Sequence, residues 1–68
     1  MKATVTTPRG ISDGVRSVEV EISAYSEMTP QAALAFARVA FGNTRGPYTI
    51  RGDGKTYRVT NGKARKTA

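Results

Sequence analysis

The chain has 68 residues, of which 38% are apolar, and it contains no cysteine, histidine or tryptophan. A chain of this length holds one small domain. The missing cysteine and histidine exclude disulfides, thiol or histidine catalysis, and the usual ligand sets for zinc, haem and iron–sulfur clusters. We therefore expect a protein without a metal or another cofactor.

The formal net charge of +6 is concentrated at the C-terminal end of the chain. Residues 1–44 contain four basic and four acidic residues, whereas residues 45–68 contain seven basic residues and one acidic residue. Such a concentration of cations attracts polyanions, and contacts with phosphates release condensed counterions. We expect nucleic acid, either DNA or RNA, as the partner. The candidate contact residues are Arg45, Arg51, Lys55, Arg58, Lys63, Arg65 and Lys66. In the alternative interpretation, the charges only keep a soluble protein apart from its neighbours.

The chain carries no sequence signal for a membrane or for secretion. No stretch reaches the roughly 18 apolar residues of a membrane-spanning helix, and the first residues lack the apolar centre of a secretion signal. We expect a cytoplasmic protein with no membrane partner.

The first third of the chain predicts a β-hairpin. Residues 2–7 alternate between two faces, as in a half-buried strand, and the turn signals Pro8-Arg9-Gly10 and Ser12-Asp13-Gly14 follow. Residues 16–25 then alternate again, with Val18, Val20 and Ile22 on one face. On this pattern Tyr25 points to the opposite, outer face.

The middle of the chain predicts one helix. Thr29 is suited to the N-cap and Pro30 to the first helical position, while Gly42-Asn43 signals the end. Residues 31–41 between them are mostly good helix formers, with Gln31 and Arg38 on the polar side.

The apolar arc of this helix is wider than one sheet can cover. Two pairs of residues are candidates for a left-over flank: Leu34 with Phe41, or Ala32 with Val39. Such a flank would suit a homodimer, unless loop residues such as Ile11 and Met28 cover it.

The last third predicts a second hairpin. Residues 48–51 and 56–60 alternate, and Asp53-Gly54 between them suits the positive φ angles of a type I′ turn. Asn61-Gly62 closes the last strand. Residues 63–68 have no apolar anchor, so they are expected to form a mobile basic tail.

The resulting order is β-β-α-β-β, an α+β fold in which one helix packs on one face of a four-stranded antiparallel sheet. Residues 1–62 form the domain and residues 63–68 the tail. The expected core consists of Val5, Val18, Val20, Ile22, Leu34, Phe36, Ala37, Ala40, Phe41, Tyr48, Ile50, Tyr57 and Val59.

The outer face of this sheet carries the chemistry that matters for binding. Threonine hydroxyls and arginine guanidinium groups on this face are good donors to phosphate. Because Tyr48 and Tyr57 have the parity of core residues, the face lacks a platform for stacking bases, which favours contact with the nucleic-acid backbone. Glu19 and Glu21 share the face, and we expect them to pair with Lys2, Arg51 or Arg58.

Enzymatic activity is not expected. Glu19 and Glu21 lie two residues apart on a predicted strand, a spacing that suits the carboxylate pair of an inverting glycosidase. Such an enzyme also needs a concave pocket, and a domain of this size with one helix has no volume for one.

The order of elements over residues 1–62 resembles that of small accessory proteins of bacteriophages and mobile elements, including some anti-CRISPR proteins. The resemblance lies in the layout and not in a shared motif. It implies a small basic binding protein, acting in the host cytoplasm if phage-encoded. The alternative to a nucleic-acid partner is a protein-binding inhibitor or adaptor that engages an acidic protein surface of a larger complex.

Overall fold

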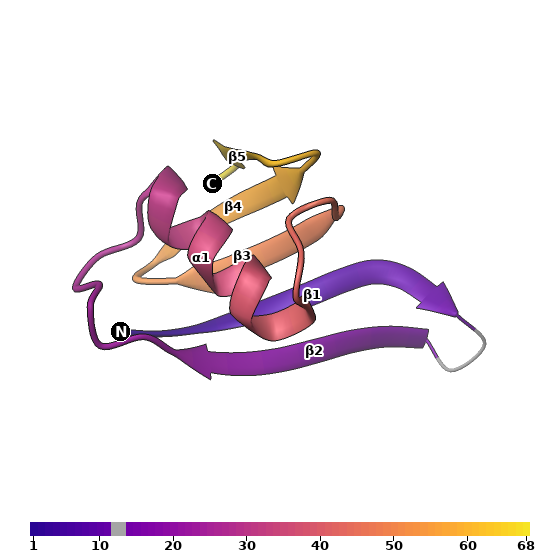
Figure 1. Ribbon diagram of the computed structural model, residues 1–68, viewed down its shortest axis with the longest axis horizontal. Helices are drawn as coiled ribbons and strands as arrows, with labels where there is room; N and C mark the ends of the chain where they lie inside the picture. The colour runs from indigo at the N-terminus through magenta and orange to yellow at the C-terminus, as the bar shows by residue number, and fades with distance from the viewer. Residues whose placement is uncertain (12–13) are drawn as a thin grey trace.

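The computed structural model describes residues 1–11 and 14–68 (Figure 1). Its elements, in chain order, are β1 (Lys2–Ile11), β2 (Gly14–Glu21), α1 (Pro30–Phe41), β3 (Tyr48–Gly52), β4 (Lys55–Thr60) and β5 (Lys63–Lys66). The first two residues of the expected Ser12-Asp13-Gly14 turn lie outside the described residues. The expected cover of the helix flank by the Ile11 side chain also lies outside the described part of the structure.

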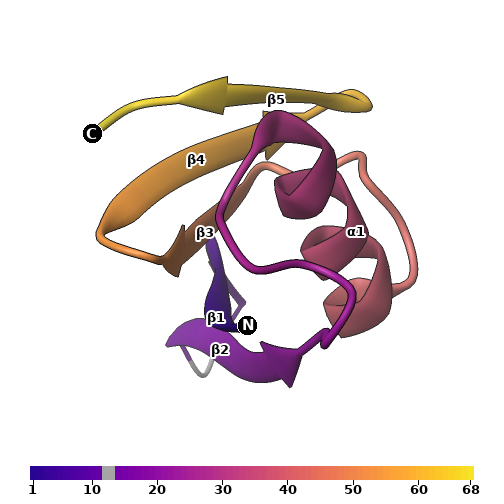
Figure 2. The ribbon, with the colours of Figure 1, turned by 90° about the vertical axis from the view of Figure 1, so that its left-hand side faces the viewer.

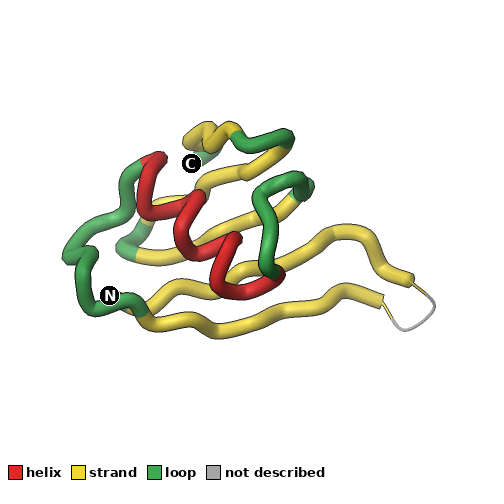
Figure 3. The backbone as a smooth tube through the Cα atoms, in the orientation of Figure 1, coloured by secondary structure: helices red, strands yellow, loops and turns green. Residues whose placement is uncertain are grey.

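The strands form one antiparallel sheet in the order β2-β1-β3-β4-β5. The helix lies across one side of this sheet (Figure 3), and the sheet curves around it from β2 to β5 (Figure 2). The expected α+β class, with one helix on one face of an antiparallel sheet, is therefore confirmed. The helix defines an inner, covered face and an outer, solvent-facing one.

The sheet has five strands and not the four expected. Residues 63–66, which the sequence analysis assigned to the tail, pair with β4 as strand β5. Asn61 and Gly62 both have positive φ, 52° and 76°, as a tight two-residue hairpin requires. The pairing continues beyond β5, where the Thr67 amide donates to the Thr56 carbonyl at 2.8 Å.

The first hairpin is longer than expected at its turn and shorter at its other end. β1 continues past Thr7 to Ile11, so the predicted Pro8-Arg9-Gly10 turn is part of the strand. The register of its pairing with β2 shifts between Thr7 and Ile11. β2 ends at Glu21 and not at residue 25. The chain then turns, and the Met1 amino group donates to the carbonyl oxygens of Ile22 at 2.8 Å and Tyr25 at 2.7 Å.

The predicted helix ends are confirmed. The Thr29 hydroxyl accepts from the Ala32 amide at 3.1 Å, and Pro30 occupies the start of the helix. Gly42 ends the helix in the left-handed region, with φ 79°, and its amide donates to the Arg38 carbonyl at 2.7 Å.

The core is centred on Phe36, which is fully buried between the helix and the sheet. Four residues that the sequence analysis left out are also buried: Ala3, Met28, Ala32 and Ala33. Five residues expected in the core are only partly buried at its rim: Val18, Ile22, Leu34, Ala40 and Phe41. The covered side of the helix thus consists of Phe36 and three small residues, alanines 32, 33 and 37, while Leu34, Ala40 and Phe41 lie at its margins.

The helix flanks are mostly covered. Met28 is 1% exposed, and the ring of Phe41 stacks on that of Tyr48 with centroids 4.8 Å apart. Of the large apolar side chains that the structure describes, Val39 alone is strongly exposed, at 63%. One exposed valine is ordinary for a protein surface, so the helix flank does not support the expected homodimer.

We predict that Gly46→Ala destabilises the fold far more than Gly54→Ala. Both glycines have positive φ, 65° and 67°, so both substitutions introduce left-handed strain of about 1–2 kcal/mol. A Cβ on Gly46 would also overlap the Val59 carbonyl oxygen and lie 2.8 Å from the Tyr48 nitrogen, whereas a Cβ on Gly54 meets nothing within 4 Å. Urea unfolding followed by circular dichroism measures both losses. Equal losses would contradict the close approach at Gly46.

Candidate nucleic-acid interface

Where its side chains are described, the outer face of the sheet is polar on all five strands. Strand alternation places the apolar residues Val5, Ile50 and Val59 under the helix, where each is fully buried. Their neighbours along the strands point the other way. On β1, β3 and β4 these outer residues are Lys2, Thr4, Thr6, Thr49, Arg51, Thr56, Arg58 and Thr60.

Four of the seven predicted contact residues lie together on this face, and we call Arg51, Arg58, Lys63 and Arg65 the basic face. Arg58 of β4 is directly opposite Arg65 of β5, and Lys63 is opposite Thr60. Arg51 of β3 is opposite Thr56, two residues along the strands from the pair that Arg58 forms with Thr49, and therefore diagonal to Arg58 on the same face. Directly opposite residues have Cβ atoms about 4.5–5.5 Å apart and diagonal ones about 7–8 Å, so the cations form a contiguous group.

A shallow hollow of about 230 Å³ lies within this group. It is lined by Arg58, Thr60, Lys63 and Arg65, and the lining therefore contains three cations, one hydroxyl and no carboxylate. Among residues 1–7 and 16–68, whose side chains are described, the one ion pair is between Lys55 and Asp53, so the cations of the basic face have no acidic partner there. The hollow is thus a region of uncompensated positive charge.

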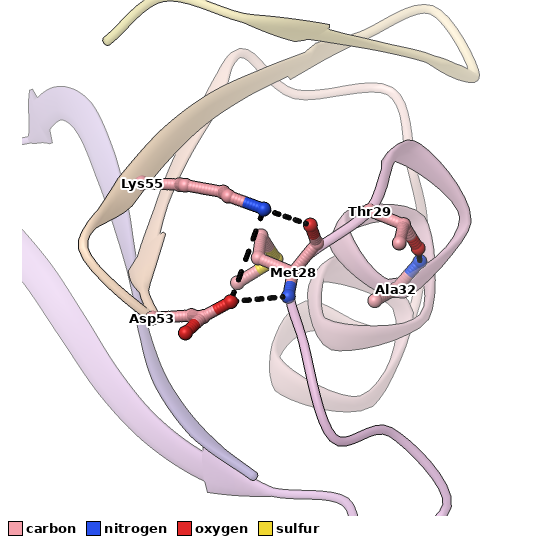
Figure 4. Close-up of polar contacts among 5 residues, drawn as sticks. All are labelled: Met28, Thr29, Ala32, Asp53 and Lys55. Carbon is pink, nitrogen blue, oxygen red and sulfur yellow. Dashed lines mark hydrogen bonds and ion pairs between the residues drawn. The ribbon is translucent and has the colours of Figure 1, made fainter.

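Lys55 belongs to a structural contact on the other side of the sheet (Figure 4). Its ammonium group lies 3.9 Å from the Asp53 carboxylate and 3.4 Å from the Met28 carbonyl oxygen. The same carboxylate accepts from the Met28 amide at 3.2 Å. These contacts tie the β3–β4 turn to the segment that leads into α1. Lys55 therefore does not join the basic face, because its side chain has the inner parity of Tyr57.

The two remaining predicted contact residues also lie apart from the basic face. Lys66 is opposite Tyr57, which places it on the helix side of β5. Arg45 is exposed in the loop between α1 and β3, and its carbonyl oxygen accepts from the Asn61 amide at 2.9 Å. The structure thus separates the seven residues into four on one face and three elsewhere.

The acidic residues of the outer face lie at its far edge. Glu19 is opposite Thr4 and Glu21 is opposite Lys2, both on the β1–β2 pair. The expected ion pairs of these glutamates with Lys2, Arg51 or Arg58 are absent among the described residues. For Arg51 and Arg58 the reason is topological, because β1 separates β2 from β3 and β4. Lys2 is opposite Glu21, but the two side chains do not form an ion pair. The face is therefore acidic at β2 and basic from β3 to β5.

None of the chain's aromatic rings stands on the outer face. Tyr48 and Tyr57 are buried under the helix, as expected. Tyr25 was expected to point outward from a strand, but it lies beyond the end of β2, and its ring centroid is 6.4 Å from that of Phe36. It therefore packs against the core, and the expectation is wrong because β2 ends four residues earlier.

The sequence analysis found the cations but not the arrangement of β5. The alignment of Arg58 with Arg65, and the place of Thr60 in the hollow, both depend on a strand that was not expected. A signal was present, because Asn61-Gly62 has the composition of a type I′ turn and implies a returning strand.

Comparisons with protein-family models, with curated proteins and with solved structures found no match to this chain. Within the described part of the chain, His, Cys, Asp and Glu do not gather in threes where they could hold a metal ion. The same part contains no helix of the length and apolarity needed to cross a membrane.

We predict that Asp53→Ala lowers the free energy of unfolding by about 1–2 kcal/mol, because the Met28 amide loses its acceptor and alanine is strained at a φ of 56°. Asp53→Asn keeps an acceptor oxygen and tolerates positive φ, so its loss is smaller.

Lys55→Gln serves as the control. The ion pair is long and both side chains are at least a third exposed, so removing it costs less than about 1 kcal/mol. Thermal unfolding of the three variants tests this order. A loss in Lys55→Gln as large as that in Asp53→Ala would show that the ion pair, and not the hydrogen bond, holds the segment.

Proposed function

We propose that this protein is a non-enzymatic nucleic-acid-binding protein that contacts the phosphate backbone through the basic face. The observation that carries the proposal is the alignment of Arg51, Arg58, Lys63 and Arg65 on three adjacent strands without a carboxylate partner among the described residues. Cations held side by side attract the regularly spaced charges of a polyanion.

The proposed contact is to phosphates and not to bases. Base recognition on a sheet uses exposed aromatic rings for stacking, and the rings of this chain pack on the inner side. Threonine hydroxyls flank the arginines on the outer face, and both groups donate well to phosphate oxygens. We therefore expect little dependence on base sequence.

The distribution of acidic residues supports a defined orientation. Glu19 and Glu21 on β2 would repel phosphates at one edge of the sheet, while the basic face attracts them at the other. The nucleic acid is thereby directed to β3, β4 and β5.

We predict that binding to duplex DNA weakens with salt, with a slope of log affinity against log salt of about −3.6 for four phosphate contacts, and about −2.8 for a single strand. On duplex DNA this corresponds to a loss of roughly 150-fold between 50 and 200 mM salt. Fluorescence anisotropy with labelled duplex DNA, single-stranded DNA and RNA measures these slopes.

Two triple variants of equal charge test the location. Arg58→Gln/Lys63→Gln/Arg65→Gln removes three contacts and is expected to reduce the duplex slope by about 2.7. Arg16→Gln/Arg38→Gln/Lys66→Gln removes the same charge from the far edge strand, the helix and the inner side of β5, and is expected to change the slope little. Equal changes of slope in the two triple variants would show that binding depends on the net charge of the protein and not on the basic face. Salt-independent binding, or none, would refute the proposed function and leave an acidic protein surface as the partner to test.

A further inference from the structure

The pairing of Arg58 with Arg65 is unfavourable in the protein alone. Like charges directly opposite each other on neighbouring strands destabilise a sheet, and Lys63 adds a third cation two residues from Arg65. Among the described residues, these three cations have no ion-pair partner. An arrangement of this kind becomes favourable when an anion lies between the cations.

The hollow that these residues line has the size for one anionic group. Its volume of about 230 Å³ is below the roughly 300–1,000 Å³ of sites that enclose a drug-sized ligand. The residues that line it carry the Thr60 hydroxyl and, on side chains long and flexible enough to turn toward an anion there, two guanidinium groups and one ammonium group. Guanidinium groups bind oxyanions with two parallel hydrogen bonds each, and a tetrahedral oxyanion has enough oxygens to accept from several donors at once.

The backbone beneath the hollow is held in place by the β4–β5 hairpin. Thr60 and Lys63 flank the Asn61-Gly62 turn, and Arg58 and Arg65 form the next pair on the outer face, two residues further along each strand. The four residues are thereby fixed at positions close to one another before any ligand arrives, which lowers the cost of ordering them.

We infer that the hollow binds a phosphate monoester group, such as the phosphate at the end of a nucleic-acid strand, in preference to an internal phosphodiester. A monoester carries a charge of about −1.5 to −2 at pH 7, whereas a phosphodiester carries one negative charge. Three cations around one hollow match the larger charge. This inference rests on the proposed function for the source of the phosphate, since free phosphate has the same chemistry.

The test compares two oligonucleotides of one sequence, with a 5′-phosphate or a 5′-hydroxyl, at equal ionic strength. The wild-type protein is expected to bind the phosphorylated strand at least about five-fold more tightly. Arg65→Gln is expected to lose this preference. Arg51→Gln, which lies on the same face outside the hollow, is expected to bind both strands more weakly and to keep the preference.

A second measurement is independent of nucleic acid. Inorganic phosphate is expected to raise the Tm of the wild-type protein by several degrees relative to chloride at equal ionic strength, and Arg65→Gln is expected to show a smaller rise. In chloride alone Arg65→Gln is expected to melt higher than the wild type, because the like-charge pair is gone.

The outcomes separate the two proposals. Salt-dependent binding without a 5′-phosphate preference would overturn the monoester site and leave the proposed function standing. A Tm rise in phosphate that depends on Arg65, without binding to any oligonucleotide, would overturn the proposed function and leave a site for free phosphate. No preference and no Arg65-dependent rise would overturn the monoester site.

Discussion

The packing of one alanine-rich helix against the sheet is the interaction on which the rest of this molecule depends. Ala32, Ala33 and Ala37 are fully buried, and Phe36, also fully buried, is the largest side chain of the core. The sheet cannot bury its apolar side without this helix, because a domain of this length has no other element to cover that side. Because the helix covers one side, the alternate residues of the strands face solvent on the other side, and those whose side chains are described are polar.

Tight turns and a few specific hydrogen bonds hold the elements around this packing. The β3–β4 and β4–β5 turns each need two residues with positive φ, and Asp53-Gly54 and Asn61-Gly62 provide them. Asp53 has a second role, since its carboxylate accepts a hydrogen bond from the Met28 amide in the segment before the helix. This hydrogen bond holds the Met28 backbone, and the Met28 side chain packs in the core, where it is 1% exposed. Local turn chemistry and core closure are therefore coupled.

The electrostatics of the outer face follow from strand order. β1 and β3 are neighbours although the helix separates them in the chain, and this leaves β2 and β5 as the two edges. Glu19 and Glu21 are placed on one edge, and Lys63 and Arg65 on the other. A protein of net charge +6 thus has a basic region and an acidic one on the same surface. Charged edge strands also oppose edge-to-edge aggregation, a structural role that is compatible with binding.

Much of the fold was readable from the sequence because local rules decide it. Thr29 and Pro30 start the helix and Gly42 ends it. Asp53-Gly54 forms the β3–β4 turn because these residue types tolerate positive φ, whatever the hairpin packs against. The excess of cations after residue 44 is likewise a property of composition. Asn61-Gly62 already signals a returning strand, but only the tertiary structure decided that residues 63–66 pair with the free edge of β4 as β5. It also decided that Asp53 and Lys55 both contact the backbone of Met28. These features depend on which strand edges and backbone groups are left free once the helix has packed, and a linear pattern of residues does not contain that information.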